Sequence, residues 1–387
     1  MAGQLLSGNH AAALGATLAG RANRAGRGFC SGVYPITPST ECMEFLCNQV
    51  IEKGHVVRVE SEHSAMAVCI GASASGARTF TTSSSNGIAY MAENLVAAAL
   101  LRLPVVMVAA NRTLGPPWNV WADHGDTLML RDSGWIQLYC ADNQEVLDSV
   151  LCAYRLAEDR RIQLPVLVCQ ESFVLSHTMG RTDVPEQEQV DRFLPPLDLP
   201  NHIDGTPRVV GGVTVPRATE VHRAQHQEAM GRVWDVYREI QDGFESEFGR
   251  RPADPVVPYR ADDADVLVVS MGTIASTVER AVDEAREKGI RLGGLRVRTF
   301  RPFPAAQLAA AFRGRKRIAV IDRNVSLGFG GVLWGEARGV ADPGALVQGY
   351  MIGIGGGDVR PGHVLAIAED TASRSAAGTP VLMEAGA

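Results

Sequence analysis

The first half of this chain alternates short apolar runs with stretches rich in alanine, glycine and serine, and this alternation is its strongest constraint on fold. The apolar runs are residues 32–34, 56–59, 79–81, 104–109 and 165–169. Short runs of this kind are typical of strands buried on both faces of a parallel sheet. The stretches between them are 41–53, 64–75, 88–101 and 145–160, and each has the length of a helix. The pattern predicts successive βαβ units, and hence a parallel sheet with helices on both faces.

The alternation stops near residue 180. Residues 180–215 are rich in proline and charge, which predicts a long surface connection. An amphipathic helix follows, because apolar residues recur there at three- and four-residue steps. They are Met230, Val233, Trp234, Tyr237, Ile240 and Phe244. A second α/β unit is predicted from Ala264, with strands at 266–270, 295–297 and 317–322 and a helix over 273–288. After Ala372 most residues are small or polar, and we expect this tail to fray.

A chain of 387 residues is long enough for at least two domains. We therefore divide it into a first α/β domain with a parallel sheet (1–180), a linker with the amphipathic helix (181–260), a second α/β domain (261–372) and a tail (373–387).

Charge and composition exclude several classes of protein. The net charge is −6, and the densest basic run is the short segment 313–317, so a nucleic-acid partner is not expected. No stretch reaches the roughly 18 apolar residues of a membrane span, and the N-terminus lacks the pattern of a signal peptide. We expect a soluble, cytoplasmic protein. The seven cysteines form no C-x-x-C pair, so we interpret them as reduced core thiols rather than cluster ligands.

Three polar side chains each come just after one of the predicted strands. Thr37 stands between Pro35 and Pro38, whose fixed φ angles favour a rigid turn that presents its hydroxyl to a pocket. The alternative is an ordinary turn into a helix. Glu62, with Glu60 close by, is at the start of a predicted helix, where a carboxylate is also favoured by the helix dipole alone.

Arg112 follows the third of these strands, where its guanidinium suits a bidentate grip on a carboxylate or phosphate. The alternative is a surface loop arginine. An open α/β sheet gathers its ligand site at the carboxyl ends of its strands, so these side chains together predict an active site for a small acid.

Two other motifs have weaker functional interpretations. Asp123, His124 and Asp126 lie close together, but no further histidine or cysteine stands at ligand spacing, so we favour loop hydrogen bonding or a subunit contact over a metal site. The glycine clusters 328–331 and 353–357 suggest phosphate cradling or tight turns. Neither has the spacing of a dinucleotide fingerprint, which favours turns.

Taken in order, these segments resemble the alpha subunit of pyruvate:ferredoxin oxidoreductases, within the wider 2-oxoacid:acceptor oxidoreductase family. The resemblance runs from about residue 8 to residue 370. Its motifs are Tyr-Pro-Ile-Thr-Pro-Ser-Thr at 34–40, Glu-Ser-Glu-His-Ser-Ala at 60–65, Thr-Thr-Ser-Ser-Ser-Asn-Gly at 81–87, Asn-Arg at 111–112, Arg-Asp-Ser-Gly-Trp at 131–135, and the segments 297–304, 320–324 and 353–359.

The resemblance implies a pyrimidine-type thiamine diphosphate-binding domain with a parallel sheet, followed by an α/β domain like the C-terminal domain of transketolase. It assigns Glu62 to the aminopyrimidine ring, where a carboxyl that exchanges a proton with N1′ promotes the reactive tautomer of the cofactor. Asn86 and Gly87 are implied to lie at the cofactor. Thr37 and Arg112 are implied to contact the carboxylate of the substrate.

The resemblance also implies what this chain must obtain from partners. No Gly-Asp-Gly motif is present to bind Mg²⁺ and the diphosphate, and the cysteines for iron–sulfur clusters are absent. We therefore expect no metal site here, and partner subunits of beta, gamma and delta type that supply Mg²⁺ and the clusters. The implied reaction is CoA-dependent oxidative decarboxylation of a 2-oxoacid to acyl-CoA and CO2, with electrons passed to ferredoxin or an NAD-reducing subunit, in anaerobic metabolism.

The substrate is left open by the sequence. Trp118 and Trp121 follow Arg112 in a loop where pyruvate-using relatives tend to have smaller residues, which suggests an aromatic acid such as phenylglyoxylate. Alternatively, these rings pack against a neighbouring subunit and the substrate is pyruvate. Two other functions also remain open: a subunit of a non-oxidative thiamine-dependent decarboxylase, and a non-catalytic assembly subunit.

Overall fold

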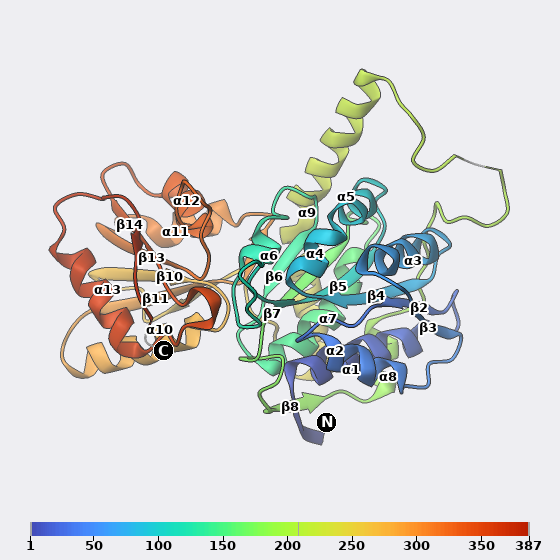
Figure 1. The fold of residues 1–387 in the computed structure, drawn as a ribbon, viewed down its shortest axis with the longest axis horizontal. Helices are drawn as coiled ribbons and strands as arrows, with labels where there is room; N and C mark the ends of the chain where they lie inside the picture. Colours follow the sequence, from blue (N-terminus) through green and yellow to red (C-terminus); the bar gives the residue numbers. More distant parts are fainter. Residues whose placement is uncertain (1, 208, 386–387) are drawn as a thin grey trace.

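Two α/β units, each built on its own sheet, make up the protein (Figure 1). The computed structural model describes residues 2–207 and 209–385. The larger sheet has seven strands in the order β12-β6-β7-β5-β4-β2-β3, and the smaller has six in the order β15-β14-β13-β10-β11-β9. The predicted α/β class with parallel sheets is therefore confirmed.

The larger sheet contains all five strands predicted for the first half. They are β2 (Phe29–Val33), β3 (Gly54–Arg58), β4 (Arg78–Ser83), β5 (Val105–Asn111) and β7 (Val166–Glu171). Strands β4, β5 and β7 are buried along their whole length, and in β5 and β7 this burial accompanies a nearly continuous apolar run without alternation. The parallel strand β6 (Ile136–Tyr139) was not predicted, because four residues give too short a pattern.

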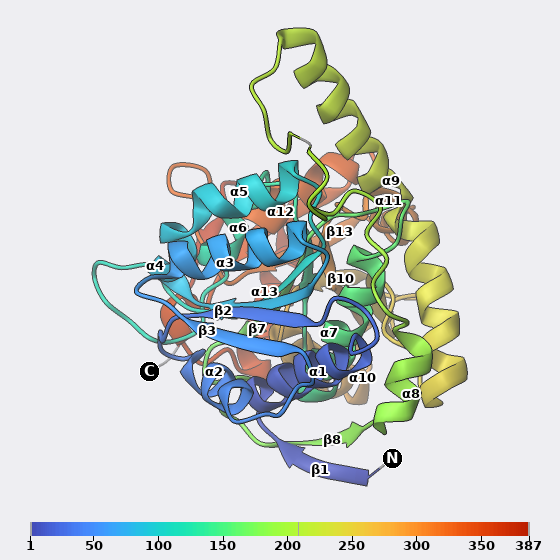
Figure 2. The ribbon, with the colours of Figure 1, turned by 90° about the vertical axis from the view of Figure 1, so that its right-hand side faces the viewer.

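Helices cover both faces of this sheet (Figure 2). On one face lie α1 (Gly8–Ala22), α2 (Thr40–Cys47) and α7 (Asn143–Ala157), and on the other lie α3 (Glu62–Ala74), α4 (Ser85–Tyr90) and α5 (Ala92–Leu100). The short helix α6 (Gly125–Leu128) adds one turn after β5. Small residues permit the close packing: a Cβ atom on Gly15 of α1 would lie 3.1 Å from the side chain of Val150 in α7.

The prediction of an irregular connection over residues 180–215 is wrong at its beginning. Strand β8 (Gly180–Val184) pairs antiparallel with β1 (Ala2–Leu6), and helix α8 (Gln187–Phe193) follows. The β8 pairing escaped prediction because its partner is at the far end of the domain. Helix α8 begins with a capping box between Glu186 and Gln189, which the sequence does contain.

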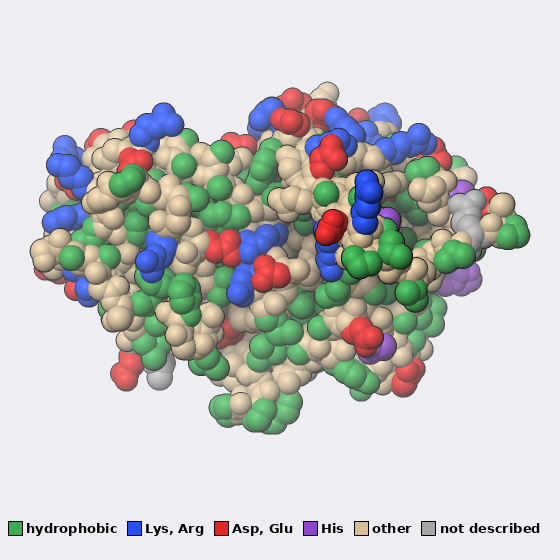
Figure 3. Space-filling model, turned by 90° about the horizontal axis from the view of Figure 1, so that it is seen from above, with side chains coloured by type: hydrophobic (Ala, Val, Ile, Leu, Met, Phe, Trp, Pro, Cys, Tyr) green, Lys and Arg blue, Asp and Glu red, His purple; other side chains and the backbone are tan. Residues whose placement is uncertain are grey.

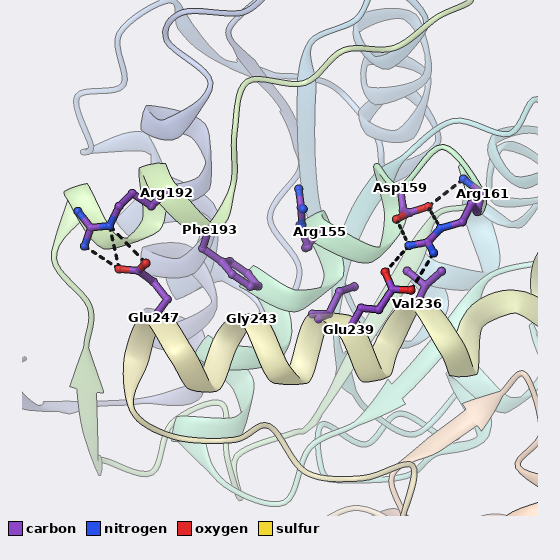
Figure 4. Close-up of a pocket in the computed structure, with 10 residues that line it drawn as sticks. Arg155, Asp159, Arg161, Arg192, Phe193, Val236, Glu239, Gly243 and Glu247 are labelled. Carbon is purple, nitrogen blue, oxygen red and sulfur yellow. Dashed lines mark hydrogen bonds and ion pairs between the residues drawn. The ribbon is translucent and has the colours of Figure 1, made fainter.

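The predicted amphipathic helix is confirmed as α9 (Pro216–Phe248), whose N-terminal end stands away from the rest of the molecule (Figures 1 and 2). Its C-terminal part packs on α7 and α8 around a pocket of 240 Å³ (Figure 4). Arg161 pairs there with Asp159 and Glu239, and Arg192 pairs with Glu247. The pairs with Glu239 and Glu247 hold α9 against the end of α7 and against α8. The pocket lies away from the carboxyl ends of the strands, where a ligand would bind, so we interpret it as structural.

The smaller sheet contains β9 (Val256–Tyr259), β10 (Val266–Ser270), β11 (Leu292–Val297), β13 (Arg317–Asp322), β14 (Leu346–Met351) and β15 (Val381–Leu382). Its helices are α10 (Ile274–Glu287), α11 (Ala305–Phe312), α12 (Val332–Ala337) and α13 (Pro361–Ser373), with 3-10 turns at Arg338–Val340 and Ile354–Gly356. The prediction that the tail frays is wrong up to residue 385, because β15 pairs with β14 and the Gln348 side chain bonds the backbone of Gly378 and Thr379.

The two units are joined by more than the linker. Strand β12 (Thr299–Arg301) leaves the second unit and pairs antiparallel with β6 at the edge of the first sheet. Just before it, Arg296 and Arg298 bond the Glu145 carboxylate at 2.6 and 2.7 Å. Buried, charge-assisted pairs of this kind fix geometry strongly, because separating them leaves a charge unpaired. The arrangement of the two units is therefore specified by their side chains.

Charges of both signs are interspersed over the face drawn in Figure 3, with no large patch of a single sign. Across residues 2–207 and 209–385, none of the helices has the length and apolarity needed to cross a membrane.

Candidate active site

Glu62 is the first residue of α3, at the point where the chain turns after β3. Ser61 is extended, with φ −162° and ψ 161°, and its hydroxyl accepts a hydrogen bond from the Ser64 amide at 3.2 Å. This cap starts the helix at Glu62 and directs its side chain inward, where it is only 7% exposed. Glu60 is in contrast exposed and bonds the Ser64 hydroxyl. Of the two predicted carboxylates, Glu62 is the buried one.

The Glu62 carboxyl lies against the turn that follows β4. A Cβ atom on Gly87 would come within 2.5 Å of Glu62 Oε1 and 2.6 Å of Ser83 Oγ, so only glycine leaves room for the carboxyl at this place. Burial raises the pKa of Glu62, opposed only by its own backbone amide. Among the described residues, no other group donates a hydrogen bond to this carboxyl. The Glu62 carboxyl is therefore held in place, and its raised pKa favours the protonated form.

Arg112 and Thr37 meet at the neighbouring strand ends. Arg112 Nη1 donates to the Thr37 carbonyl at 2.6 Å, and Nε donates to the Asn119 carbonyl at 3.1 Å. Arg112 is 8% exposed, and burial lowers its pKa without approaching neutrality. Thr37 is exposed, in a turn whose bond to Pro38 is cis. The structure thus brings together the two residues that were predicted to bind a substrate carboxylate.

Asn86 links these two parts of the site. Its amide donates to the Gly115 carbonyl at 3.2 Å and accepts from the Gly115 amide at 3.0 Å, while Ser85 Oγ donates to the Thr113 carbonyl at 2.5 Å. The turn that holds Gly87 against Glu62 is therefore fastened to the loop that follows Arg112. In this chain the Asn86 amide is engaged by the protein backbone, and its contact with a cofactor stays a prediction.

Asp126, for which the sequence favoured loop hydrogen bonding, joins two segments of the site. Its carboxylate accepts from the Ser85 amide at 3.0 Å, the Arg112 amide at 2.9 Å and Asn111 Nδ2 at 2.9 Å. It is fully buried, and burial raises its pKa to about 7. The only signal was its place in the motif considered for metal binding, and the described residues contain no group of three or more histidine, cysteine or acidic side chains able to hold a metal. Asp126 instead positions the backbone of two site segments.

The two tryptophans lie outside this buried arrangement. Trp118 is 69% exposed and packs over Gly115, and Trp121 is 50% exposed with its ring 4.7 Å from that of Phe173. Neither ring is enclosed by this chain, so a contact between Trp118 and a substrate remains a prediction.

All of these side chains follow the carboxyl ends of β2, β3, β4 and β5, which are parallel neighbours. A buried carboxyl in a cradle that a Cβ atom would fill fits the aminopyrimidine side of thiamine diphosphate, which needs an acid at one ring nitrogen. The site and the paired α/β units define the class of thiamine diphosphate-dependent enzymes.

Comparisons with known proteins extend this conclusion. Residues 22–242 match the family described as pyruvate flavodoxin/ferredoxin oxidoreductase, thiamine diphosphate-binding, and residues 264–364 match the pyruvate:ferredoxin oxidoreductase core domain II. The chain belongs to this oxidoreductase family, and the resemblance seen in its motifs is confirmed.

Its relatives include subunits of two kinds. It is 42% identical over 343 residues to the pyruvate synthase subunit PorA of Methanothermobacter thermautotrophicus, covering 88% of this chain and 89% of that subunit. It is 41% identical over 385 residues to the ketoisovalerate oxidoreductase subunit VorA of Pyrococcus abyssi, covering 95% and 93%.

Solved structures share the fold. The 2-oxoglutarate:ferredoxin oxidoreductase of Magnetococcus marinus aligns with a TM-score of 0.74 at 20% identity over 96% of this chain, which spans 65% of the length of that chain. The transketolase of Leishmania mexicana aligns with a TM-score of 0.57 at 13% identity over 98% of this chain and 48% of its own. These similarities support the predicted pair of domains, one thiamine diphosphate-binding and one like transketolase.

Proposed function

We propose that this chain is the alpha subunit of a 2-oxoacid oxidoreductase and supplies both the pyrimidine side of the thiamine diphosphate site and the anchor for the substrate carboxylate. The observation that carries the proposal is the buried Glu62 carboxyl, seated against Gly87 in a turn that is bonded to the Arg112 loop. The reaction is CoA-dependent oxidative decarboxylation of a 2-oxoacid, with electrons leaving to ferredoxin.

Glu62 and Gly87 would hold the aminopyrimidine ring of the cofactor. Thiamine diphosphate, when bound, supplies a carbon nucleophile and an electron sink for decarboxylation. Glu62 contributes a proton at the ring nitrogen, and its raised pKa suits that role because the carboxyl can remain protonated closer to neutral pH. Apart from its own backbone amide, no described residue donates a hydrogen bond to the carboxyl, which leaves it able to bond the ring.

Arg112 would bind the substrate carboxylate. The carbonyls of Thr37 and Asn119 accept hydrogen bonds from Nη1 and Nε and hold the guanidinium rigid, while Nη2 has no hydrogen bond to the described residues and is left to bind a carboxylate. Thr37 adds a hydroxyl at the same place. PorA and VorA relatives are named for pyruvate and ketoisovalerate, and both of these 2-oxoacids carry the carboxylate that such a site grips. Trp118, in the loop beyond, would contact the rest of the substrate and separate small acids from aromatic ones such as phenylglyoxylate.

Partner subunits would complete the site. Beside α3, the exposed apolar side chains Tyr90, Val96 and Leu100 lie on α4 and α5, 61%, 37% and 41% exposed. A diphosphate- and Mg²⁺-binding subunit of beta type would cover this face and close the cofactor between the two chains. Gamma- and delta-type subunits would carry the iron–sulfur clusters and deliver electrons to ferredoxin or an NAD-reducing subunit, in the cytoplasm.

Two substitutions in the assembled complex test the proposal, with reduction of methyl viologen by a 2-oxoacid and CoA as the assay. Glu62→Gln keeps the shape of the side chain but removes the carboxyl proton, so we expect the turnover number to fall at least ~100-fold, the lower limit of the range for general acid–base groups. Arg112→Lys keeps the charge but not the fork, so we expect the KM for the acid to rise by roughly tenfold or more.

Other outcomes would select the alternatives. Full turnover of Glu62→Gln with intact assembly would identify a non-catalytic assembly subunit. Decarboxylation without viologen reduction, by a complex lacking iron–sulfur colour, would identify a non-oxidative decarboxylase. An unchanged KM in Arg112→Lys would remove the arginine from the substrate site.

A further inference from the structure

We propose that the cavity between the two α/β units is a second ligand site, which binds the phosphate or carboxylate group of a small molecule with an aromatic or other apolar body. The cavity has a volume of 490 Å³. Residues from both units line it, among them Trp121 and Phe173 from the first unit and Thr273, Ser276, Arg323 and Asp358 from the second. Glu62 and Arg112 do not line it, so this site is separate from the candidate active site.

The cavity lies where the topology of the smaller sheet predicts a binding site. Strand β10 pairs in parallel with β11 on one side and with β13 on the other, so the strand order reverses between β10 and β13. In open α/β sheets, ligands bind at such a switch point, outside the carboxyl ends of the strands. Thr273 follows β10 and Arg323 follows β13, and both line the cavity.

Arg323 is the residue that indicates an anion. It is 6% exposed, yet within residues 2–207 and 209–385 its guanidinium makes no hydrogen bond, and its Nε atom is among the buried polar atoms without a partner. Among the described residues its one ion pair joins Nη1 to the Glu171 carboxylate at 3.4 Å, and Asp123 also lies near enough to interact with its charge. Buried polar groups are hydrogen-bonded in the great majority of cases, and a guanidinium offers five donors. An oxyanion in the cavity would satisfy them.

Glu171 does not accept hydrogen bonds from the free donors of Arg323. It accepts hydrogen bonds from His124 Nε2 at 3.0 Å, from the Thr273 amide at 2.9 Å and from Thr273 Oγ1 at 2.5 Å. These bonds give the carboxylate hydrogen-bond donors other than Arg323, whose positive charge lowers the Glu171 pKa, and they occupy the amide of Thr273, the residue just before α10. The carboxylate of Asp358, which also lines the cavity, accepts a hydrogen bond from Arg360 at 2.7 Å. Recognition of an anion therefore depends on Arg323, with the Ser276 and Thr277 hydroxyls close by.

The aromatic and aliphatic side chains that line the cavity indicate the chemistry of the rest of the ligand. The rings of Trp121 and Phe173 lie 4.7 Å apart and are followed by Val174 and Leu175 along the cavity. A cavity lined by apolar side chains and one guanidinium suits a molecule with one charged end, and the volume is within the ~300–1,000 Å³ of small-molecule pockets. An aryl phosphate or an aryl carboxylate has both features.

Titration calorimetry on the purified full-length chain tests the site with three probes: phenyl phosphate, benzoate and the uncharged benzyl alcohol. We expect saturable binding of at least one anion with Kd of roughly 1 mM or below, and none of benzyl alcohol. Arg323→Gln should weaken the anion at least ~10-fold, because it removes a charge-assisted hydrogen bond. A response to phenyl phosphate alone would identify the ligand group as phosphate, and a response to benzoate alone would identify a carboxylate.

A second variant covers the case in which Arg323→Gln disturbs folding. Ser276→Phe adds a large side chain at an exposed position of α10 that lines the cavity, and should abolish binding. Glu287→Phe, at the exposed end of the same helix, adds a comparable side chain outside the cavity and should bind like the wild type. Binding that survives Ser276→Phe, or equal affinity for benzyl alcohol and the anions, would overturn the proposal, as would no saturable binding of either anion.

Discussion

Gly87→Ala is the substitution that examines the active-site geometry most directly. The added Cβ atom would come within 2.5 Å of Glu62 Oε1 and 2.9 Å of its Cδ, where ordinary contacts begin at 3.4 Å. Because Ser83 Oγ crowds the same Cβ atom at 2.6 Å, the carboxyl has to move by roughly 1 Å. A displacement of about 1 Å can cost ~10²-fold in rate, equivalent to about 2.7 kcal/mol of barrier.

The folding cost of this substitution should be small. The Glu62 carboxyl is the far end of a flexible side chain, and alanine is a better helix former than glycine within α4 by about 1 kcal/mol. We therefore expect a nearly unchanged melting temperature together with a large loss of turnover. Loss of both would instead indicate that the turn itself had collapsed.

The assay is the initial rate of viologen reduction by the assembled complex, with saturating 2-oxoacid and CoA, next to a thermal melt of each variant. Gly231→Ala is the matched control, because a Cβ atom on that α9 glycine meets nothing within 4 Å. It should keep the wild-type rate. A Gly87→Ala complex that turns over at the wild-type rate would refute the placement of the Glu62 carboxyl at the cofactor.

Three further predictions concern stability and specificity. Burial raises the pKa of Asp126 from 3.8 to about 7, so this residue should make stability fall as pH rises through that interval. Asp126→Asn should make the melting temperature depend less on pH over the same interval. The positive charge of Arg323 and the hydrogen bonds from His124 and Thr273 lower the pKa of Glu171 from 4.5 to about 2. Its contribution to the free energy of unfolding is therefore present above pH 4.5 and lost as the pH falls. Glu171→Ala should cost about 3 kcal/mol in urea unfolding at neutral pH and make stability less sensitive to acid. Trp118→Ala should lower kcat/KM for phenylglyoxylate relative to pyruvate by roughly tenfold, whereas an unchanged ratio would leave Trp118 as an interface residue.

The sequence identified those features that depend on local burial and strand ends. The runs at β5 and β7 were recognisable because buried apolar residues follow one another there, and Thr37, Glu62 and Arg112 were identified because they come shortly after β2, β3 and β5. These are relations between neighbours in the chain. The family motifs then assigned a role to each residue.

Features that depend on distant partners were not predictable in the same way. Strand β12 is three residues long and exists only because β6, far upstream, presents an edge to it. Asp126 acts by accepting bonds from the backbone amides of Ser85 and Arg112, and no residue type in the sequence marks an amide that needs an acceptor. Arg323 belongs to a motif of the second domain, and only the fold reveals that its donors are left over.

Glu62 has a consequence for stability that is opposite to its effect on catalysis. Its pKa is raised by burial, so the ionised form destabilises the folded chain, and this cost appears as pH rises above the ordinary range of a carboxyl. Glu62→Gln should therefore raise the melting temperature of the isolated chain at neutral pH, and the difference from wild type should disappear in acid, where both side chains are uncharged. The same substitution should abolish turnover of the complex. If the buried acid lowers the stability of the folded chain but is needed for the reaction, the higher melting temperature and the lost turnover should occur together. If the melting temperature fell at neutral pH instead, Glu62 would be a stabilising helix cap, and its carboxylate would have no functional reason to be buried.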